Sequence, residues 1–348
     1  MSLRKIGFFI LSFVLVFASC TNDDVAAISS TIEIDLEEKR DADNDSIVSY
    51  LETHYYNSSA FDANNTNINN LVITEINKGD DVPAGNTLLF DNVEKESYTL
   101  GDIIYEYYIL RINQGGGYKS PKFSDHVLIA YEGFSLLNDA VFDSRLNPNP
   151  SSLDLSGTIN GWKLVIPSFN TSINPVNNGD GTFTYNNSGA GMMFIPSGLA
   201  YLFDVRSPLQ LVPLVFKFEL LDSFENDHDN DGIPSYLEDL DDDLILFGES
   251  IEEDNTDGDN LNNFVDNDDD GDGILTRDEL KSNTYMVDTK NGGIEPVLDG
   301  TIEFEVSREE DADGVITIKT LKIVDSNGDN IKDYLDADIM EVNNTEDY

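Results

Sequence analysis

The chain contains one cysteine, Cys20, and only three histidines, His54, His126 and His228. A single cysteine excludes an intramolecular disulfide, so the folded regions need another source of stability. The histidines are scattered along the sequence and have no spacing typical of a zinc or catalytic centre. The sequence therefore predicts neither a disulfide scaffold nor a histidine-based active site.

Basic residues are also few. The 348 residues include 20 Lys or Arg and 67 Asp or Glu, which gives a formal net charge of −47. This charge repels phosphate, so nucleic acid is not an expected partner. The excess lies at the C-terminus, because 39 acidic and seven basic residues follow residue 224.

The apolar run at the N-terminus, Ile6–Phe17, is too short to span a membrane and has the length of a secretion signal. It leads into Phe17–Cys20, which resembles a lipoprotein cleavage box. We expect a signal peptide over residues 1–19, an acylated Cys20 and a polar tether over 20–35. Acylation would anchor the mature chain stably to a membrane.

The first residues after Cys20, Thr21–Asp24, resemble short acidic signals that send lipoproteins of some Gram-negative bacteria to the outer surface. The expected location is therefore the outer membrane, with the protein facing the periplasm or the cell surface.

Residues 36–97 read as an extension before the main domain. Ile47, Tyr50, Leu51 and Tyr55 recur with helical spacing, and Asp45 is a suitable N-cap. Two later segments alternate in polarity and are predicted to be strands; they are residues 71–76 and 105–112.

The region from Ser124 to Phe224 contains six short segments in a distinctive order. They are Asp125–Gly133, Val141–Ser144, Gly157–Trp162, Met193–Pro196, Leu199–Tyr201 and Leu214–Leu221. Together they resemble the FKBP-type peptidyl-prolyl cis-trans isomerases over about 100 to 125 residues. The resemblance implies an α+β fold, in which a half-open antiparallel sheet wraps over a short helix that opens near Ile159, within an isomerase domain spanning 98–224.

The resemblance also implies a pocket for proline. Its residues in this chain would be Tyr131, Phe142, Asp143, Ile159, Trp162, Tyr201 and Phe216. Trp162 would form the floor, Phe142 and Phe216 the walls, and Tyr201 would donate a hydrogen bond to the peptide. Rotation of an X-Pro amide crosses a barrier of roughly 18 to 20 kcal/mol and needs no nucleophile, metal or cofactor.

Two departures from the family leave a second function open. Leu202 stands where the family usually has Gly, and Pro208–Pro213 replaces the usual loop before the last strand. The leading interpretation is an anchored isomerase that assists the folding of exported X-Pro-containing proteins. The alternative is a non-catalytic FKBP-like peptide-binding or adhesion module on a calcium-dependent stalk.

The acidic region, residues 225–348, contains repeated calcium-loop patterns. Two copies match D-x-D-x-D-G-x5-E at every position; they are Asp227, Asp229, Asp231, Glu238 and Asp268, Asp270, Asp272, Glu279. Two looser copies have Asn in place of the loop Gly; they are Asn255, Asp257, Asp259, Asp266 and Asp325, Asn327, Asp329, Asp336.

Asp266 ends one loop and Asp268 begins the next, which leaves no room for the paired helices of an EF-hand. The region instead resembles a thrombospondin type 3-like array, in which structural Ca²⁺ replaces an apolar core. Residues 301–324 alternate in polarity and are expected to form a hairpin between loops.

The segment Asp41–Glu52 parallels Asp227–Glu238 almost residue for residue. It is either an acidic helix start or a further calcium loop, and the sequence leaves both open. Isomerase lipoproteins associated with gliding motility carry a similar helical extension before an FKBP domain, and the chain resembles that type.

Overall fold

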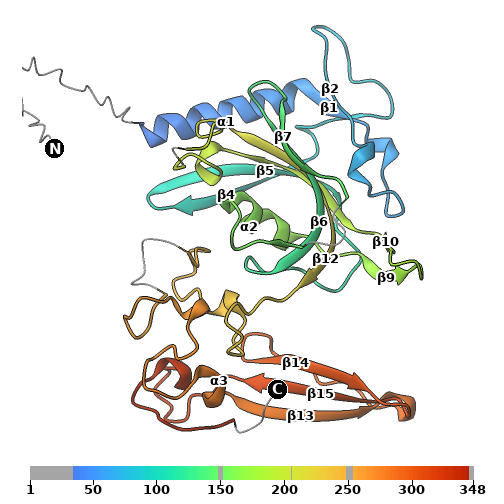
Figure 1. Cartoon of the computed structure of the whole chain (residues 1–348). Coiled ribbons are helices and arrows are strands. Elements are labelled where there is room, and N and C mark those ends of the chain that lie inside the picture. The colour runs from blue at the N-terminus through green and yellow to red at the C-terminus, as the bar shows by residue number, and fades with distance from the viewer. Residues whose placement is uncertain (1–33, 148–151, 205, 248–253, 345–348) are drawn as a thin grey trace, which may run out of the picture. The chain divides into compact units, whose positions relative to one another are not determined.

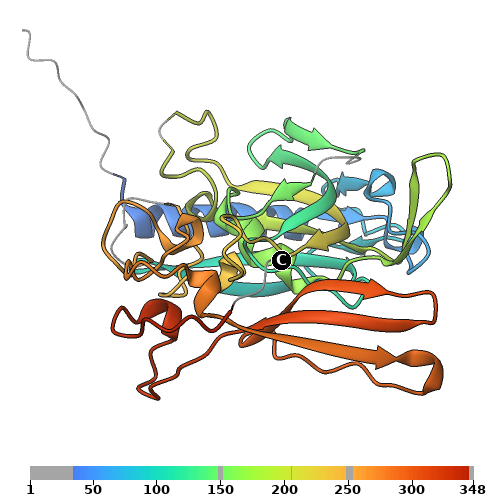
Figure 2. The ribbon, with the colours of Figure 1, turned by 60° about the horizontal axis from the view of Figure 1, so that its bottom comes forward.

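The computed structural model describes residues 34–147, 152–204, 206–247 and 254–344 (Figures 1 and 2). Leu36–Tyr348 make up one compact unit. The predicted signal peptide, Cys20 and all of the tether up to residue 33 lie outside the described residues. Within the described part of the chain, no helix is both long and apolar enough to cross a membrane.

The main sheet is antiparallel, with the strand order β4-β5-β11-β12-β6-β7 and with β8 paired to β6. Its strands are β4 (Val93–Leu100), β5 (Ile103–Asn113), β6 (His126–Ser135), β7 (Val141–Arg145), β8 (Leu153–Asp154), β11 (Gly189–Ile195) and β12 (Leu214–Phe224). The strand predicted over 105–112 is confirmed as part of β5. The sheet curves around the short helix α2 (Asn160–Val165), as Figure 1 shows, and the expected antiparallel sheet over one helix is confirmed.

Both faces of this sheet are covered, and the central strands are apolar on both sides for that reason. Every residue of β11 is buried. Met193 and Ile195 belong to the core that contains α2, whereas Met192 and Phe194 belong to the core that contains α1 (Leu36–Thr53). The N-terminal helix therefore covers the face of the sheet opposite to α2.

Helix α2 lies very close to the sheet. A Cβ at Gly161 would be 2.5 Å from the Ile195 side chain, so only glycine permits this approach. The helix is short because Pro167 follows it; the chain continues as a single 3-10 turn, Ile166–Ser168. This packing holds the first turn of α2 at one end of the sheet.

Helix α1 begins earlier than the sequence suggests. It begins at Leu36, so Asp45 lies within the helix and is not its N-cap, and Tyr55 lies in the following strand. The early start reflects two acidic residues in the first turn, which favour a helix N-terminus. Ile47 and Leu51 are fully buried, as their spacing predicts.

The calcium-loop hypothesis for Asp41–Glu52 is wrong, because these residues are helical. Successive residues of a helix are separated by about 100°, so Asp43 points away from Asp41 and Asp45. Asp43 is 1% exposed, pairs with Lys39, and accepts a hydrogen bond from the backbone N–H of Ser197 at 2.8 Å. This carboxylate therefore joins α1 to the turn after β11.

Replacing Asp43 with alanine is expected to lower the free energy of unfolding by about 3 kcal/mol, because the buried Ser197 N–H loses its charged acceptor. Urea denaturation followed by circular dichroism measures the change. Asp45→Ala is the matched control, since Asp45 is exposed on the same helix. Equal stability of the two variants would contradict this role of Asp43.

Smaller elements extend the sheet region. A three-stranded sheet has the order β2-β1-β3; its strands are β1 (His54–Tyr56), β2 (Ile73–Glu75) and β3 (Thr87–Leu88). The strand predicted over 71–76 is confirmed as β2. Between α2 and β11 in the sequence, the chain forms a separate hairpin of β9 (Ile173–Asn177) and β10 (Phe183–Asn186).

The C-terminal region combines loops with a three-stranded antiparallel sheet, whose strands lie side by side in the order β13-β15-β14 (Figure 2). The elements are α3 (Thr276–Glu279), β13 (Lys281–Asp288), β14 (Glu303–Glu310) and β15 (Val315–Lys322). The expected hairpin over 301–324 is confirmed as β14 and β15. A small core joins this sheet to the first loop through Ile233, Leu280 and Leu321.

Candidate functional site

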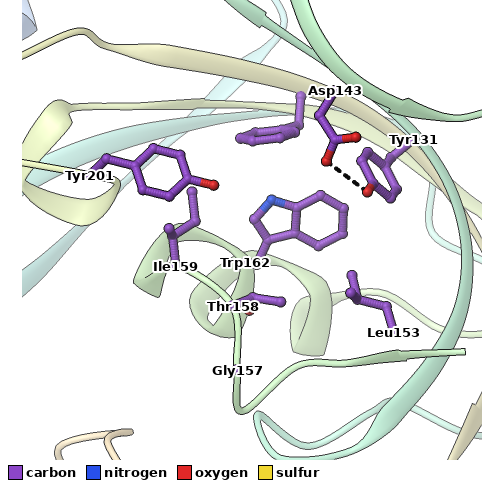
Figure 3. A pocket seen from close by; sticks show the side chains of 9 residues that line it. Tyr131, Asp143, Leu153, Gly157, Thr158, Ile159, Trp162 and Tyr201 are labelled. Carbon is purple, nitrogen blue, oxygen red and sulfur yellow. Dashed lines mark hydrogen bonds between the residues drawn. The ribbon is translucent and has the colours of Figure 1, made fainter. Parts of the chain in front are cut away.

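A pocket of about 280 Å³ opens at the first turn of α2 (Figure 3). It is lined by Tyr131, Asp143, Leu153, Gly157, Thr158, Ile159, Trp162, Tyr201 and Phe216. This volume is just below the usual range for small-molecule sites, so it suits one or two residues of a peptide. The structure brings six of the seven sequence-predicted pocket residues to this cavity.

Trp162 lies at the bottom of the pocket and is 3% exposed. Its ring meets Tyr131 edge to face at 5.0 Å and Phe216 edge to face at 5.2 Å, measured between ring centroids. Such edge-to-face pairs are favourable beyond their buried area and fix the orientation of each ring. The floor is therefore rigid and apolar.

Asp143 supplies the carboxylate at the rim. The Tyr131 hydroxyl donates a hydrogen bond to Asp143 Oδ2 at 2.9 Å (Figure 3). Burial raises the pKa of Tyr131 to about 12, and the bond to Asp143 adds to this shift. Tyr131 consequently remains a protonated donor at neutral pH and holds the carboxylate in place.

Tyr201 points toward the pocket from the turn after the 3-10 helix η4 (Ser197–Leu199) (Figure 3). Burial raises the pKa of its hydroxyl, and the charges of Asp143 and Asp204 raise it further. The hydroxyl thus stays protonated and available as a donor. The start of this turn is held by Asp43 of α1, so the extension anchors the segment that carries Tyr201.

Phe142 does not line the pocket. Its ring packs edge to face on Phe216, with centroids 5.5 Å apart, so it supports a wall from behind. Sequence reasoning missed Leu153, Gly157 and Thr158. The signal for the last two was present, because they precede Ile159 within a motif already recognised. Leu153 comes from a two-residue strand with no periodicity of its own.

The replaced loop before β12 also contributes to this region. Leu202 is 2% exposed, and Leu209 and Val212 pack against the core that contains Trp162. Leu202 and the replaced loop therefore contribute apolar side chains to the core beside the pocket.

The acidic region gathers carboxylates into several compact groups. Each group has oxygens within 4.8 Å of one another; the groups at predicted positions are Asp227, Asp229, Asp231; Asp257, Asp259, Asp266; and Asp268, Asp270, Asp272. Glu279 is 1% exposed, and burial with the charges of Asp270 and Asp272 raises its pKa to about 9. Glu279 therefore lies close enough to the second loop for the charges of that loop to act on its carboxylate.

Many of these oxygens have no hydrogen-bond partner although they are buried. They include Oδ2 of Asp229, Asp231, Asp270 and Asp272, and Oε1 of Glu279. Burial raises the pKa of Asp229 to about 7, and the neighbouring Asp227 contributes. Buried carboxylates that face one another without a partner fit a cation with oxygen ligands.

Sequence reasoning missed two parts of the acidic region. Asp239, Asp241, Asp243 and Asp254 form a further group, and Asp269 joins Asp231 and Glu238 in another. The first was hidden because Leu244 occupies the position that Gly232 has in the first loop. Both residues have a positive φ, 65° for Leu244 and 102° for Gly232, so the loop conformation is kept without the glycine.

The fourth predicted loop is arranged differently. Among the described residues, Asp325, Asp329 and Asp336 do not form a group of the same compactness. Instead, Nδ2 of Asn327 donates hydrogen bonds to Asp329 at 3.1 Å and to Asp336 at 3.0 Å. The side-chain amide of Asn327 thus gives each of these two carboxylates a hydrogen-bond donor.

Comparisons with known proteins give partial matches. Residues 228–297 match the family described as BamM C-terminal. No curated protein matches the sequence. Among solved structures, FkpA from Escherichia coli is similar over 37% of this chain and 52% of its own, with 26% identity and a TM-score of 0.28.

Two structures from Arabidopsis thaliana are also similar. The N-terminal domain of FKBP42 is 15% identical over 38% of this chain and 95% of its own, with a TM-score of 0.27. A multi-domain immunophilin is 14% identical over 40% of this chain and 49% of its own, with a TM-score of 0.27. This chain thus spans about half the length of FkpA and of the multi-domain immunophilin.

Proposed function

We propose that the chain is a peptidyl-prolyl cis-trans isomerase of the FKBP type, anchored as a lipoprotein, that assists the folding of exported proteins. The observation that carries this proposal is the apolar pocket at the first turn of α2, with Trp162 as its floor and Asp143 and Tyr201 at its rim. The ordered sequence segments that resemble this family supply most of that pocket.

The pocket supports catalysis without a reacting group. A planar X-Pro amide is more dipolar than the twisted amide at the top of the barrier. An apolar cavity that excludes water therefore destabilises the planar state more than the twisted one. A barrier lower by roughly 7 kcal/mol corresponds to a rate about 10⁵-fold higher.

Three groups would hold the peptide during rotation. The proline ring would rest on Trp162, and the Tyr201 hydroxyl would donate a hydrogen bond to the peptide backbone. The backbone N–H of Ile159, at the N-cap of α2, would hold the carbonyl that follows the proline. These contacts fix one side of the amide, so that the other side can turn.

We also propose that the acidic region binds structural Ca²⁺. The buried carboxylate oxygens without partners support it, because calcium takes six to eight oxygen ligands. Bound ions would neutralise the repulsion within each loop, and their binding energy would stabilise the folded region. Calcium has no role in the isomerisation step itself.

The location follows from the same proposal. An acylated Cys20 would hold the chain at the outer membrane, facing the periplasm or the cell surface, where unfolded exported proteins are available. The match of residues 228–297 to the BamM C-terminal family is consistent with an outer-membrane-associated protein.

The function is tested by refolding a protein whose slow phase is limited by proline isomerisation, which takes about 10 to 100 s without a catalyst. Adding the purified protein in calcium is expected to shorten this phase in proportion to its concentration, whereas Asp143→Val should shorten it less. A slow phase unchanged by a folded wild-type protein that still binds the unfolded substrate would favour the peptide-binding module instead.

A further inference from the structure

Two groups of carboxylates in the acidic region share one residue. Asp227, Asp229 and Asp231 place one oxygen each within 4.8 Å of the others, and so do Asp231, Glu238 and Asp269. The loop pattern assigned Glu238 to the first group. In the structure Glu238 instead lies with Asp269, which belongs to the following loop.

The three carboxylates of the second group are buried, and most of their oxygens have no hydrogen-bond donor. Glu238 is 0% exposed, and Asp231 and Asp269 are each 1% exposed. Both carboxylate oxygens of Glu238, both of Asp269, and Oδ2 of Asp231 have no hydrogen-bond partner. Because a buried unpaired charge costs several kcal/mol, three such carboxyl groups facing one another need either a cation between them or bound protons.

Neighbouring side chains do not provide that charge. Among the described residues, no Lys, Arg or His forms an ion pair with Asp231, Glu238 or Asp269.

The position of Asp269 is fixed independently of any ion. Its backbone N–H donates to Oγ1 of Thr276 at 3.1 Å. Asn267, two residues earlier in the chain, donates through Nδ2 to the carbonyl of Asp229 at 3.3 Å. The second loop is therefore held against the first by contacts that aim the Asp269 carboxylate at Asp231 and Glu238.

We propose that Asp231, Glu238 and Asp269 hold a second calcium ion, which Asp231 bridges to the ion at Asp227 and Asp229. This inference rests on the proposed calcium binding. The ligands are oxygen atoms only, with no nitrogen or sulfur, which favours a hard cation such as Ca²⁺. Because Asp269 comes from the loop at 268–279, the two loops bind calcium as one unit.

The number of bound ions tests the shared site. The full chain is dialysed against calcium, and calcium per chain is measured by mass spectrometry for wild type and Asp269→Asn. The variant is expected to bind one ion fewer. Asp313→Asn is the matched control, because Asp313 is exposed in the β14–β15 turn and carries the same change of charge. It should bind as many ions as wild type.

The unfolding temperature gives a second readout, in which Asp269→Asn has different effects without calcium and with it. In EGTA, Asp269→Asn should unfold at the same or a higher temperature than wild type, because one repelling carboxylate is gone. In calcium, its increase in unfolding temperature should be smaller than that of wild type. Glu238→Gln is expected to behave in the same way.

The two proposals fail differently. A wild-type number of ions in Asp269→Asn, with the full calcium-dependent increase in unfolding temperature, would overturn the shared site alone. A wild-type chain that retains no calcium would overturn both the shared site and the proposed calcium binding.

Discussion

Trp162→Ala is expected to lower kcat/KM for X-Pro isomerisation about 100-fold, which corresponds to about 2.7 kcal/mol of lost transition-state stabilisation. The indole is the floor of the pocket and orients both Tyr131 and Phe216 by edge-to-face contacts. Without it, water enters beneath the proline ring and solvates the planar amide, so the preference for the twisted state is lost. Exchange between the cis and trans peptide signals in NMR measures the effect.

Phe218→Ala is the control for the loss of packing. Phe218 is fully buried in the same core and packs on Phe169 at 4.9 Å, but it does not line the pocket. Each variant should lose about 3 to 5 kcal/mol of stability, and both are compared at a temperature where both remain folded. An equal loss of activity in Phe218→Ala would contradict the assignment of Trp162 as the floor.

Removal of calcium has the second large expected effect. With EGTA, amide hydrogen exchange should accelerate strongly across residues 227–247 and 254–280, whereas β5, β6, β11 and β12 should stay protected. The loops contain few apolar residues, and their buried carboxylates repel one another once the ions leave. Each occupied site raises the free energy of unfolding by about 2.7 kcal/mol when calcium is at 100 times its Kd.

Calcium should restore the protection, and an equal concentration of magnesium should not, because magnesium dehydrates reluctantly and requires near-octahedral geometry. Protection in the loops that is the same in EGTA and in calcium would contradict the structural role of the ion. Loss of protection in β11 as well would show that the two regions unfold together.

The pocket was predictable because its residues lie in short segments whose order identifies the fold. Alternation along β6 and β12 places Tyr131 and Phe216 on the same face of the sheet, and the N-terminus of α2 supplies Ile159 and Trp162. Phe142 was misplaced because its position on β7 reveals nothing about the tilt of its ring. That orientation depends on the contact with Phe216, which is tertiary.

The N-terminal helix shows where local rules fail. Asp45 looks like an N-cap, and Asp41–Glu52 looks like a calcium loop, because both patterns depend on acidic residues alone. The deciding contact is between Asp43 and Ser197, which are 154 residues apart in sequence. No local pattern predicts an acceptor for a backbone N–H at that distance.

The acidic region was predictable one loop at a time. Each loop pattern treats its second position as pointing outward, so Asp269 was passed over, although the adjacent loop lies on that side. The group around Asp239 was missed because Leu244, with φ of 65°, takes the place of a glycine. In this conformation the carbonyl of Leu244 accepts a hydrogen bond from Nζ of Lys163 at 2.6 Å.

The most direct test of the central claim is NMR exchange of a short X-Pro peptide with the purified protein in calcium. The pocket geometry predicts that the cis-to-trans exchange rate rises linearly with protein concentration, well above the uncatalysed rate. Peptide signals that shift on binding while the exchange rate stays at its uncatalysed value would contradict the isomerase and leave a peptide-binding pocket.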